Sequence, residues 1–287
     1  MGITLGSNIA SLKAQRTLGL STESLGRTFE RLSSGQRINR ASDDAAGLAI
    51  ADSLKASQRV ATVAIRNAND GISTIAIADS ALGEIGNVLS RLAELAEQSA
   101  NGVFSTVQRS ALSNEFVALS SEIERIATTT QFNGVTLLSG GNQLTLQVGF
   151  NSSSTSQISF TGVQGTLQAL GLAPTGTSVL TFSIQGGSVD AAQSASRNAL
   201  DAINNAITSL ASTRGTLGAT ESRLQVAINS LTVARENFAA AESRIRDVDV
   251  ASEAAELTRL NILQQAGSAI LAQANQQPSL ALSLLRG

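Results

Sequence analysis

The sequence predicts a mainly α protein: a long antiparallel coiled-coil or helical-bundle rod with a small β-hairpin region between its two helical halves. Three observations predict this fold class. Apolar residues repeat every seven positions in both halves of the chain, the only prolines are Pro174 and Pro278, and residues 140–189 change to the apolar–polar alternation of strands.

The N-terminal half contains three helical segments, each with a narrow apolar seam. The seams consist of Leu18, Leu25 and Leu32; of Ile75, Leu82, Leu89 and Ala96; and of Leu112, Phe116, Leu119, Ile123 and Ile126. Spacings of seven, or of four and three in turn, are typical of a coiled coil rather than of a broad globular face. We therefore expect these helices to pack lengthwise against other helices.

The C-terminal half repeats the pattern more regularly. No proline interrupts it from Asp190 to Gln277, and its seam residues fall seven apart at Leu217, Leu224, Leu231, Phe238 and Ile245. We expect Ile75, Leu82, Leu224 and Leu231 to hold the rod together. The helix surfaces are weakly charged, since only 15% of the residues in the chain are charged. Such surfaces suit a protein whose copies pack against one another.

Residues 140–189 separate the two helical halves. The segment LTLQVGFNSSSTSQISF alternates apolar and polar residues around an Asn-Ser-Ser-Ser turn, and VLTFSIQGG alternates again before two glycines. We predict a small β-hairpin region there, carried on the helical rod.

The stretch ERLSSGQRINRASDDAAGLAIA, from Glu30 to Ala51, interrupts the first half. Its Ser-Ser-Gly could suggest a phosphate loop, and its paired aspartates a metal site or an acid/base pair. The alternative is a connection between helices, because cations favour a helix end and Ser or Asp a helix start. The residues of this connection are Arg37, Arg40, Ser42, Asp43 and Asp44.

A second break, SRIRDVDVASEAAE, contains Arg244, Arg246 and Asp247. One break lies about 42 residues from the start and the other about 40 from the end, so two antiparallel arms would bring them to the same height. We predict a domain joint there. The expected parts are residues 1–42 with 246–287, residues 43–139 with 190–245 as the helical rod, and the region 140–189.

Composition excludes most catalytic chemistry. The chain has no cysteine and no histidine, so it lacks thiolate and imidazole nucleophiles, bases and zinc ligands. We predict no enzyme activity, no catalytic residue, no cofactor and no metal. A net charge of −2 gives no footprint for nucleic acid, and no continuous apolar run approaches the roughly 18 residues that span a bilayer. The N-terminal MGITLGSNIASLKAQR has no cleavable signal pattern, so export is expected by another route.

Four blocks in order closely resemble bacterial flagellins. They are RLSSGQRINRASDDAAGLAIA, RNANDGIS from Arg66 to Ser73, TQFNGVTLL from Thr130 to Leu138, and the closing AGSAILAQANQQPSLALSLLR. The resemblance covers nearly all of residues 1–140 and 190–287. It implies a structural subunit of the extracellular flagellar filament that serves swimming motility, without large outer domains. The alternative is a hook–filament junction protein, which has similar termini.

The resemblance also implies partners. Flagellins pair their terminal helices in the filament core, polymerise with themselves, leave through the flagellar type III apparatus with an export chaperone, and meet cap and hook-associated proteins. The core assembly residues that we expect are Leu18, Leu25, Leu32, Leu257, Leu260, Ile270 and Leu271.

Host innate receptors are further partners that the resemblance implies. The segment SRLAELAEQSAN resembles the flagellin helix read by Toll-like receptors, with the candidate contacts Arg91, Glu94, Leu95 and Glu115. It departs from the usual residues at Ser90, Ala93 and Glu97. The other interpretation is that Leu95 belongs to the seam and Arg91 pairs with Glu94 along one helix. Leu282, Leu284 and Leu285 resemble the apolar terminus sensed by inflammasome receptors.

Overall fold

A computed structural model describes residues 7–140, 143–160 and 163–286, with side chains described as far as residue 276. Five α-helices dominate this described part, and the strands are short. In chain order the elements are α1 (Ile9–Ser34), α2 (Ala45–Ala100), α3 (Thr106–Thr129), β1 (Gln131–Phe132), β2 (Val135–Thr136), β3 (Leu144–Gln147), the 3-10 turn η1 (Ser154–Ser156), β4 (Gln157–Phe160), α4 (Val189–Arg246) and α5 (Val250–Arg286). The predicted fold class is confirmed.

The chain forms two compact units. The terminal unit comprises Met1–Gln58 with Glu236–Gly287, and the rod unit comprises Arg59–Arg235. The division falls inside α2 and α4, not at the helix breaks, because contacts of Asp52 and Arg246 tie the first turns of α2 to the break before α5. The three domain parts expected from the sequence remain a prediction.

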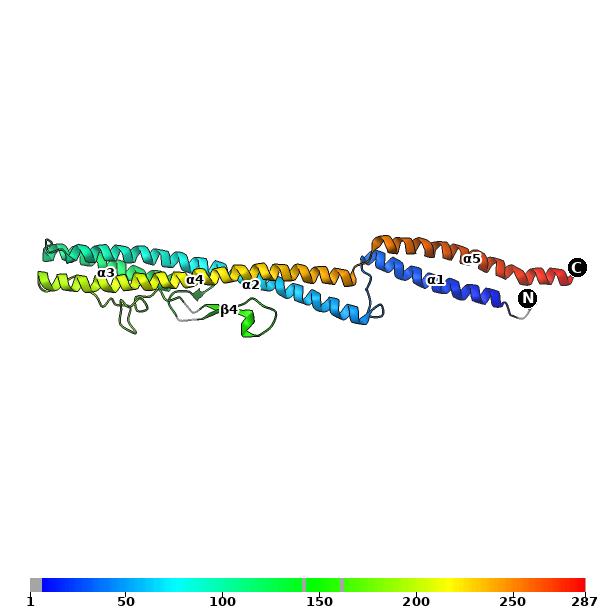
Figure 1. The fold of residues 1–287 in the computed structure, drawn as a ribbon, viewed down its shortest axis with the longest axis horizontal. Helices are drawn as coiled ribbons and strands as arrows, with labels where there is room; N and C mark the ends of the chain where they lie inside the picture. The colour runs from blue at the N-terminus through cyan, green and yellow to red at the C-terminus, as the bar shows by residue number, and fades with distance from the viewer. Residues whose placement is uncertain (1–6, 141–142, 161–162, 287) are drawn as a thin grey trace. The chain divides into compact units, whose positions relative to one another are not determined.

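In the rod unit, α2, α3 and α4 pack side by side around one apolar core (Figure 1). The predicted seams of α2, α3 and α4 fill it, and their buried members include Ile75, Leu82, Leu89, Ala96, Phe116, Ile123, Leu217 and Leu224. Arg214 on α4 adds a bidentate ion pair to Asp79 on α2, at 2.7 and 3.0 Å. This pair is half exposed, so burial of the seams provides most of the stabilisation.

A tight hairpin follows α3 directly. Strands β1 and β2 pair antiparallel, with Phe132 opposite Val135. The turn between them is Asn133-Gly134, and both residues have positive φ, at 50° and 78°. Because Asn and Gly are the residues that adopt such angles at low cost, the sequence specifies this turn locally. The sequence block TQFNGVTLL resembles flagellins, but this hairpin was not predicted from it.

The predicted hairpin LTLQVGFNSSSTSQISF is confirmed as β3 and β4, which pair antiparallel from Leu144 opposite Phe160 to Gln147 opposite Gln157. Its Leu146 rests against α2 at Gly71, where an added Cβ would lie 2.2 Å from Leu146 Cδ1. A glycine inside a helix costs about 1 kcal/mol relative to alanine. We infer that Gly71, within the block RNANDGIS, allows the hairpin to approach α2 this closely.

The second predicted strand, VLTFSIQGG at residues 179–187, is wrong. This segment has no strand, although Ile184 is fully buried in the rod core. The carbonyl of Ile184 accepts from Ser99 Oγ of α2 at 2.8 Å and from Ser196 Oγ of α4 at 3.4 Å. Helix hydroxyls therefore satisfy a backbone group that a strand would have paired in a ladder.

Among the described residues, α2 is the one helix long and apolar enough to cross a membrane by length and composition. A helix at the core of a water-soluble bundle passes the same test, and 33% of the apolar window is buried inside the fold. Helix α2 supplies Leu82, Leu89 and Leu92 to the rod core. Its apolar residues therefore have a packing role in the rod unit.

Candidate assembly site

Helices α1 and α5 form an antiparallel pair in the terminal unit (Figure 1). At one end of the pair, Ser11 Oγ donates to Asn275 Oδ1 at 2.8 Å. At the other end, the Val248 N–H donates to the Gly35 carbonyl at 3.1 Å. The antiparallel pairing expected from the two matched breaks is therefore present.

The predicted core residues mostly line the seam between these two helices. Leu260 is buried, Ile270 is exposed, and the other five are half-buried, at Leu18, Leu25, Leu32, Leu257 and Leu271. Leu18 packs over the backbone of Gly267, where an added Cβ would lie 3.3 Å from Leu18 Cδ1. The pair thus buries only one narrow apolar seam, which is a small buried apolar area for two helices of this length.

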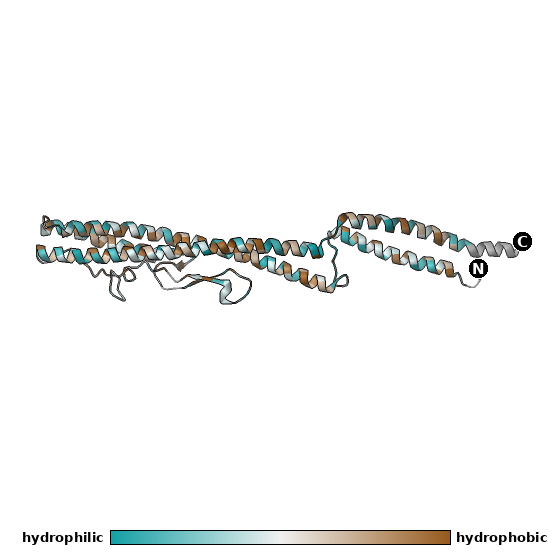
Figure 2. Cartoon of the chain, in the orientation of Figure 1, coloured by the Kyte–Doolittle hydropathy of each residue, from teal (hydrophilic) through white to brown (hydrophobic). Residues whose placement is uncertain are grey.

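The outer faces of the same pair carry a second apolar set. Its members are more than half exposed, at Ile9, Leu12, Leu20, Phe29, Ile262 and Ile270. Leu20 lies two positions from seam residue Leu18, so it points to the opposite side of α1. Apolar segments recur along both helices among hydrophilic ones (Figure 2). An apolar set of this size on two helices is typical of a protein interaction surface.

Asn8 joins the start of α1 to the C-terminal half of α5. Its Oδ1 accepts from the Ser11 N–H at 3.0 Å as the helix N-cap, and its Nδ2 donates to the Ala274 carbonyl at 2.7 Å. Residue 278, four positions after Ala274, is a proline and has no N–H to donate to that carbonyl. Asn8 therefore supplies the hydrogen bond that Pro278 removes from α5.

We predict that Asn8→Asp weakens the helix pair by about 1 kcal/mol, because aspartate keeps the cap but loses the donor to Ala274. In a Pro278→Ala background the new N–H at residue 278 bonds to Ala274, so most of this loss should disappear. Amide hydrogen exchange at Ser11 and along α5 measures both losses. Equal losses in the two backgrounds would show that Asn8 and Pro278 are not coupled.

The joint connects the end of α1 to the break between α4 and α5. Gly35 ends α1 in the left-handed conformation, with φ of 70°, and Gln36 forms an isolated antiparallel bridge with Asp247. The Arg37 N–H donates to the Arg246 carbonyl at 2.6 Å. These backbone bonds bring the two sequence-predicted breaks together within the terminal unit.

Two arginines reinforce the joint. Arg37 Nη2 donates to the Ile245 carbonyl at 2.7 Å, which caps the end of α4. Arg246 Nε donates to Gln36 Oε1 at 3.0 Å, and its Nη1 lies 3.4 Å from Asp52 Oδ1. The Arg246 side chain is 16% exposed, so these contacts are partly shielded from water.

The aspartates of the first break have separate roles. Asp44 accepts from the Gly47 N–H at 2.9 Å at the start of α2, as predicted for a helix-start carboxylate. The same role predicted for Asp43 is wrong: its Oδ2 accepts from the N–H groups of Arg40 at 3.0 Å and Asn39 at 3.2 Å. The chain turns back before α2, so the N–H groups that lie nearest to the Asp43 carboxylate belong to residues upstream of it.

The Asp43 carboxyl makes the stability of this turn depend on pH. The hydrogen bond from the Arg40 N–H, then that from Asn39, lowers the pKa of its carboxyl, and the charges of Arg31 and Arg40 add to the effect. A carboxyl whose pKa is depressed in the folded state stabilises that state at pH values above its unfolded pKa of about 3.9. The stabilisation is lost as the pH falls through the folded-state pKa.

We therefore predict that the turn loosens in acid, and that Asp43→Asn removes this part of the pH dependence while keeping an acceptor for both N–H groups. Exchange of the Asn39 and Arg40 amides from pH 6 to pH 3 tests this difference. Asp79, Glu122 and Glu256 also have lowered pKa values, so only the difference between the two proteins is diagnostic. The same acid response in both proteins would contradict the prediction.

Other joint residues were partly foreseen. Arg40 pairs with Glu30 at 2.9 Å. Asp247 contributes its backbone to the bridge, whereas Ser42 and Arg244 are exposed and make no side-chain hydrogen bond or ion pair with the described residues. Sequence reasoning missed Gln36, Asn39, Glu30 and Asp52. No local signal marks these four, because their partners are distant in sequence or lie across a turn.

The candidate receptor residues lie in the rod unit. Arg91 bonds Glu94 at 2.8 Å along α2 and Glu115 at 2.9 Å across to α3, and these hydrogen bonds raise the pKa of Arg91. All three side chains are about half exposed or more. Leu95 is fully buried, so the expected surface contact at Leu95 is wrong: its side chain packs in the apolar core of the rod unit.

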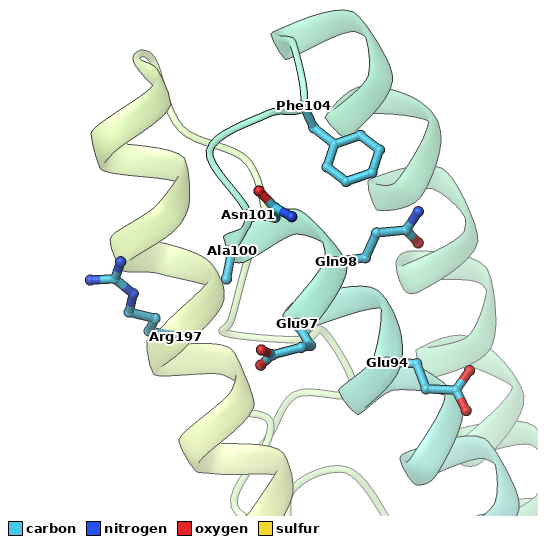
Figure 3. A pocket seen from close by; sticks show the side chains of 7 residues that line it. All are labelled: Glu94, Glu97, Gln98, Ala100, Asn101, Phe104 and Arg197. Carbon is cyan, nitrogen blue, oxygen red and sulfur yellow. The ribbon is translucent and has the colours of Figure 1, made fainter.

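An open cavity of about 650 Å³ lies at the end of α2 (Figure 3). Its lining comes from α2, the following turn and α4, at Glu94, Glu97, Gln98, Ala100, Asn101, Phe104 and Arg197. No described residues here or elsewhere group three or more Asp, Glu, His or Cys side chains that could hold a metal ion. The assembly surface of the terminal unit is therefore the stronger functional candidate.

Comparison with known proteins gives one family throughout. The family described as the bacterial flagellin N-terminal helical region matches residues 5–143, and the bacterial flagellin C-terminal helical region matches residues 200–285. A flagellin of Halalkalibacterium halodurans is 42% identical over 283 residues, covering 98% of this chain and 99% of that protein. A flagellar filament 33 kDa core protein of Treponema phagedenis is 39% identical over 291 residues, with the same coverage.

Among solved structures, a putative flagellar hook-associated protein from Vibrio parahaemolyticus shares the fold. The TM-score is 0.59 and the identity 13%, and the match covers 71% of this chain and 100% of that one. At this identity the likeness concerns the fold alone.

Proposed function

This chain belongs to the bacterial flagellin family and is a structural subunit of the flagellar filament, not an enzyme, and we propose that its terminal unit supplies the contacts that polymerise it. The observation that carries the proposal is the apolar outer surface of the α1–α5 pair. Ile9, Leu12 and Ile270 are each about 60% exposed in the single subunit. Water-exposed apolar side chains of this number favour a covered position in an assembly.

The mechanism is repeated contact between different faces of neighbouring subunits. When such a head-to-tail contact does not close into a ring, it generates a helical filament. Burial of the outer apolar set contributes roughly 25 cal/mol per Å² of apolar area before ordering costs. The low charge of the chain limits repulsion between packed copies.

We assign residues 1–42 with 246–287 to the inner filament core. Residues 43–139 with 190–245 then form the helical rod outside it, and 140–189 a small β region on that rod. The exposed apolar set of α1 and α5 supports the first assignment. The continuous buried seams of α2 and α4 support the second, because the rod unit has a core of its own.

Seeded polymerisation of truncated chains tests the proposal. Full-length protein added to filament fragments should form sedimentable polymer, whereas chains lacking residues 1–42 or 246–287 should stay unpolymerised and helical. Circular dichroism confirms that the truncated chains keep their rod helices. Polymer formation by both truncated chains would mean that the rod unit alone carries the assembly contacts.

Family membership supports the finer parts of the function. These are swimming motility, an extracellular position in the filament, export through the flagellar type III apparatus with its chaperone, and contact with cap and hook-associated proteins. Loss of the protein from culture medium in a strain without a working flagellar export gate tests the export route. Normal secretion in that strain would exclude it.

We also infer a role as an innate-receptor ligand, carried by Arg91, Glu94 and Glu115. The exposed Arg91 joins acidic partners on two helices, which gives a polar patch of fixed geometry. Arg91→Ala should lower signalling through a Toll-like reporter while filaments remain normal, and unchanged signalling would exclude these residues. Leu282, Leu284 and Leu285, expected at an inflammasome receptor, have side chains outside the described residues.

A hook–filament junction protein is the second candidate, and the fold shared with the Vibrio parahaemolyticus protein is compatible with it. Abundance separates the two functions. A filament subunit is present in far more copies than a junction protein, so mass spectrometry of sheared filaments should find this chain as a main component. A trace amount there would favour the junction.

A further inference from the structure

The chain contains two Asn-Gly pairs, and one of them, Asn101-Gly102, begins the turn that follows α2. The other, Asn133-Gly134, forms the turn of the β1–β2 hairpin. All four residues are exposed. An asparagine followed by glycine is chemically labile, because glycine has no Cβ to keep its backbone nitrogen away from the asparagine side-chain amide. The two pairs have the same sequence, so their conformations decide how readily each reacts.

The side chain of Asn101 folds back over the backbone that follows it (Figure 3). Its Oδ1 accepts from the Val103 N–H at 3.1 Å, and this turn carries the side-chain amide toward the Gly102 nitrogen that lies between them in the chain. The Val103 N–H also stabilises negative charge that develops on Oδ1 when a nucleophile attacks Cγ. The Gly102 N–H makes no hydrogen bond with the described residues, so its nitrogen is available as that nucleophile.

Asn133 has a conformation that opposes the same reaction. It lies in the left-handed region, with φ of 50°, in a two-residue turn between the paired strand residues Phe132 and Val135. Closing a ring between Asn133 and Gly134 requires the peptide between them to rotate out of the turn, so the hairpin must open first. Residues 101–105, in contrast, belong to no strand or helix. The peptides after Asn101 therefore rotate at a lower cost.

A buried cation contacts the backbone of Asn101. The Arg109 side chain of α3 is 1% exposed, and its Nη2 donates to the Asn101 carbonyl at 2.8 Å and its Nε to the Ser99 carbonyl at 3.0 Å. Nη1 has no hydrogen-bond partner among the described residues. Carbonyl oxygens carry no net charge, so no described carboxylate bonds this guanidinium. A buried charge without a counter-charge is unfavourable in a protein interior.

We propose that Asn101 is a site of spontaneous deamidation in the folded chain, and that Arg109 directs the product to isoaspartate. The Gly102 nitrogen attacks Asn101 Cγ and loses its proton, the bond from Cγ to the side-chain nitrogen breaks, and ammonia leaves. The product of this step is a cyclic imide, and water then opens one of its two C–N bonds. The reaction needs no enzyme and no oxidant, so the modified residue accumulates with the age of the chain.

Arg109 decides which imide bond opens. The backbone carbonyl of residue 101 remains bonded to Arg109 Nη2, and the cation makes this carbonyl carbon the preferred target of water. The Val103 N–H polarises the other carbonyl less, because it is a neutral donor. Opening at the backbone carbonyl breaks its bond to the Gly102 nitrogen and leaves a carboxylate on residue 101, which is now isoaspartate. This carboxylate gives the buried guanidinium the counter-charge that it lacks.

Ageing of the full-length chain, once folded and once unfolded in denaturant, tests the proposal. Peptide mass spectrometry with electron-transfer fragmentation separates asparagine, aspartate and isoaspartate. In the folded chain, residue 101 should deamidate at least about tenfold faster than residue 133, because the hairpin must open before residue 133 reacts. In denaturant the two residues should react at similar rates. The isoaspartate fraction at residue 101 should be higher in the folded chain, because only this chain holds Arg109 against the carbonyl.

Variants separate the roles of the turn and of the cation. Val103 is 86% exposed, so its substitution changes no packed side chain. Val103→Pro removes the N–H that bonds Asn101 Oδ1 and should slow deamidation about tenfold, whereas Val103→Ala keeps this N–H and should react as the natural chain does. Arg109→Met should lower the isoaspartate fraction without stopping deamidation. Since Arg109→Met is at risk of not folding, the comparison of the folded and unfolded natural chain decides.

Three results would overturn the proposal. If residue 101 of the folded chain reacts no faster than residue 133, the turn after α2 does not promote the reaction. Equal rates in Val103→Pro and Val103→Ala would show that the bond to Asn101 Oδ1 has no role. An isoaspartate fraction at residue 101 that is the same in the folded and the unfolded chain would show that Arg109 does not direct the opening of the imide.

Discussion

Ile270→Glu and Leu12→Glu are each expected to abolish filament growth while the single subunit remains folded. Both side chains are 61% exposed in the subunit, so a carboxylate there stays hydrated and does not disturb the α1–α5 seam. In a filament that covers this surface, the same carboxylate loses its water and the apolar contact is lost as well. Together these effects should raise the critical concentration for polymerisation at least about 100-fold.

Sedimentation after seeding measures the critical concentration, and circular dichroism of the unpolymerised fraction confirms that the helices are intact. Gln265→Glu provides the matched control, because it adds the same charge at an exposed polar position of α5 without removing apolar surface. It should retain much more assembly than Ile270→Glu. If both Ile270→Glu and Leu12→Glu polymerise normally, the outer apolar set is not an interface.

The seven-residue spacing predicted the helices and their buried faces well. Leu82, Leu89, Leu217 and Leu224 are all buried where the seams place them. The pattern succeeds because a helix that packs lengthwise buries positions at regular intervals, and this regularity is present in each helix separately. The matched breaks were also informative, since antiparallel arms of similar length bring their irregularities together.

The apolar–polar alternation was less reliable where the core is irregular. It predicted β3 and β4 correctly but failed at residues 179–187, whose buried Ile184 is held by Ser99 and Ser196 on two helices. A strand needs a partner edge, and the alternation of one segment does not show whether an edge is available. Tertiary contacts decided the conformation instead.

Several site residues had no signal in the sequence because their partners come from distant segments. Asn8 could have been recognised as a helix start, but its bond to the carbonyl that Pro278 leaves free depends on the pairing of α1 with α5. Arg109 likewise occupies an ordinary position in the helical pattern. Its burial against Ser99 and Asn101 follows from how α2 ends, which no local spacing shows.

Arg246→Met is expected to loosen the joint and change the form of the filament. Methionine keeps much of the apolar stem but loses the hydrogen bond to Gln36 and the contact with Asp52. The bond to Gln36 involves a charged, partly buried donor, and such bonds contribute about 1.5–3 kcal/mol. The pair with Asp52 adds little, because the Asp52 side chain is 61% exposed.

The change should appear first in the amides that hold the two breaks together. Exchange of the Arg37 and Val248 N–H groups should become faster by a factor of ten or more, since each 1.4 kcal/mol corresponds to about tenfold. Arg244→Met, two positions earlier on the same helix, removes an exposed arginine that makes no side-chain bond to the described residues, and it should leave both amides protected. Electron microscopy of the two variants then relates joint stability to filament shape. If Arg246→Met exchanges faster but builds filaments of normal shape, the joint serves subunit stability alone, and its proposed role in setting filament form is wrong.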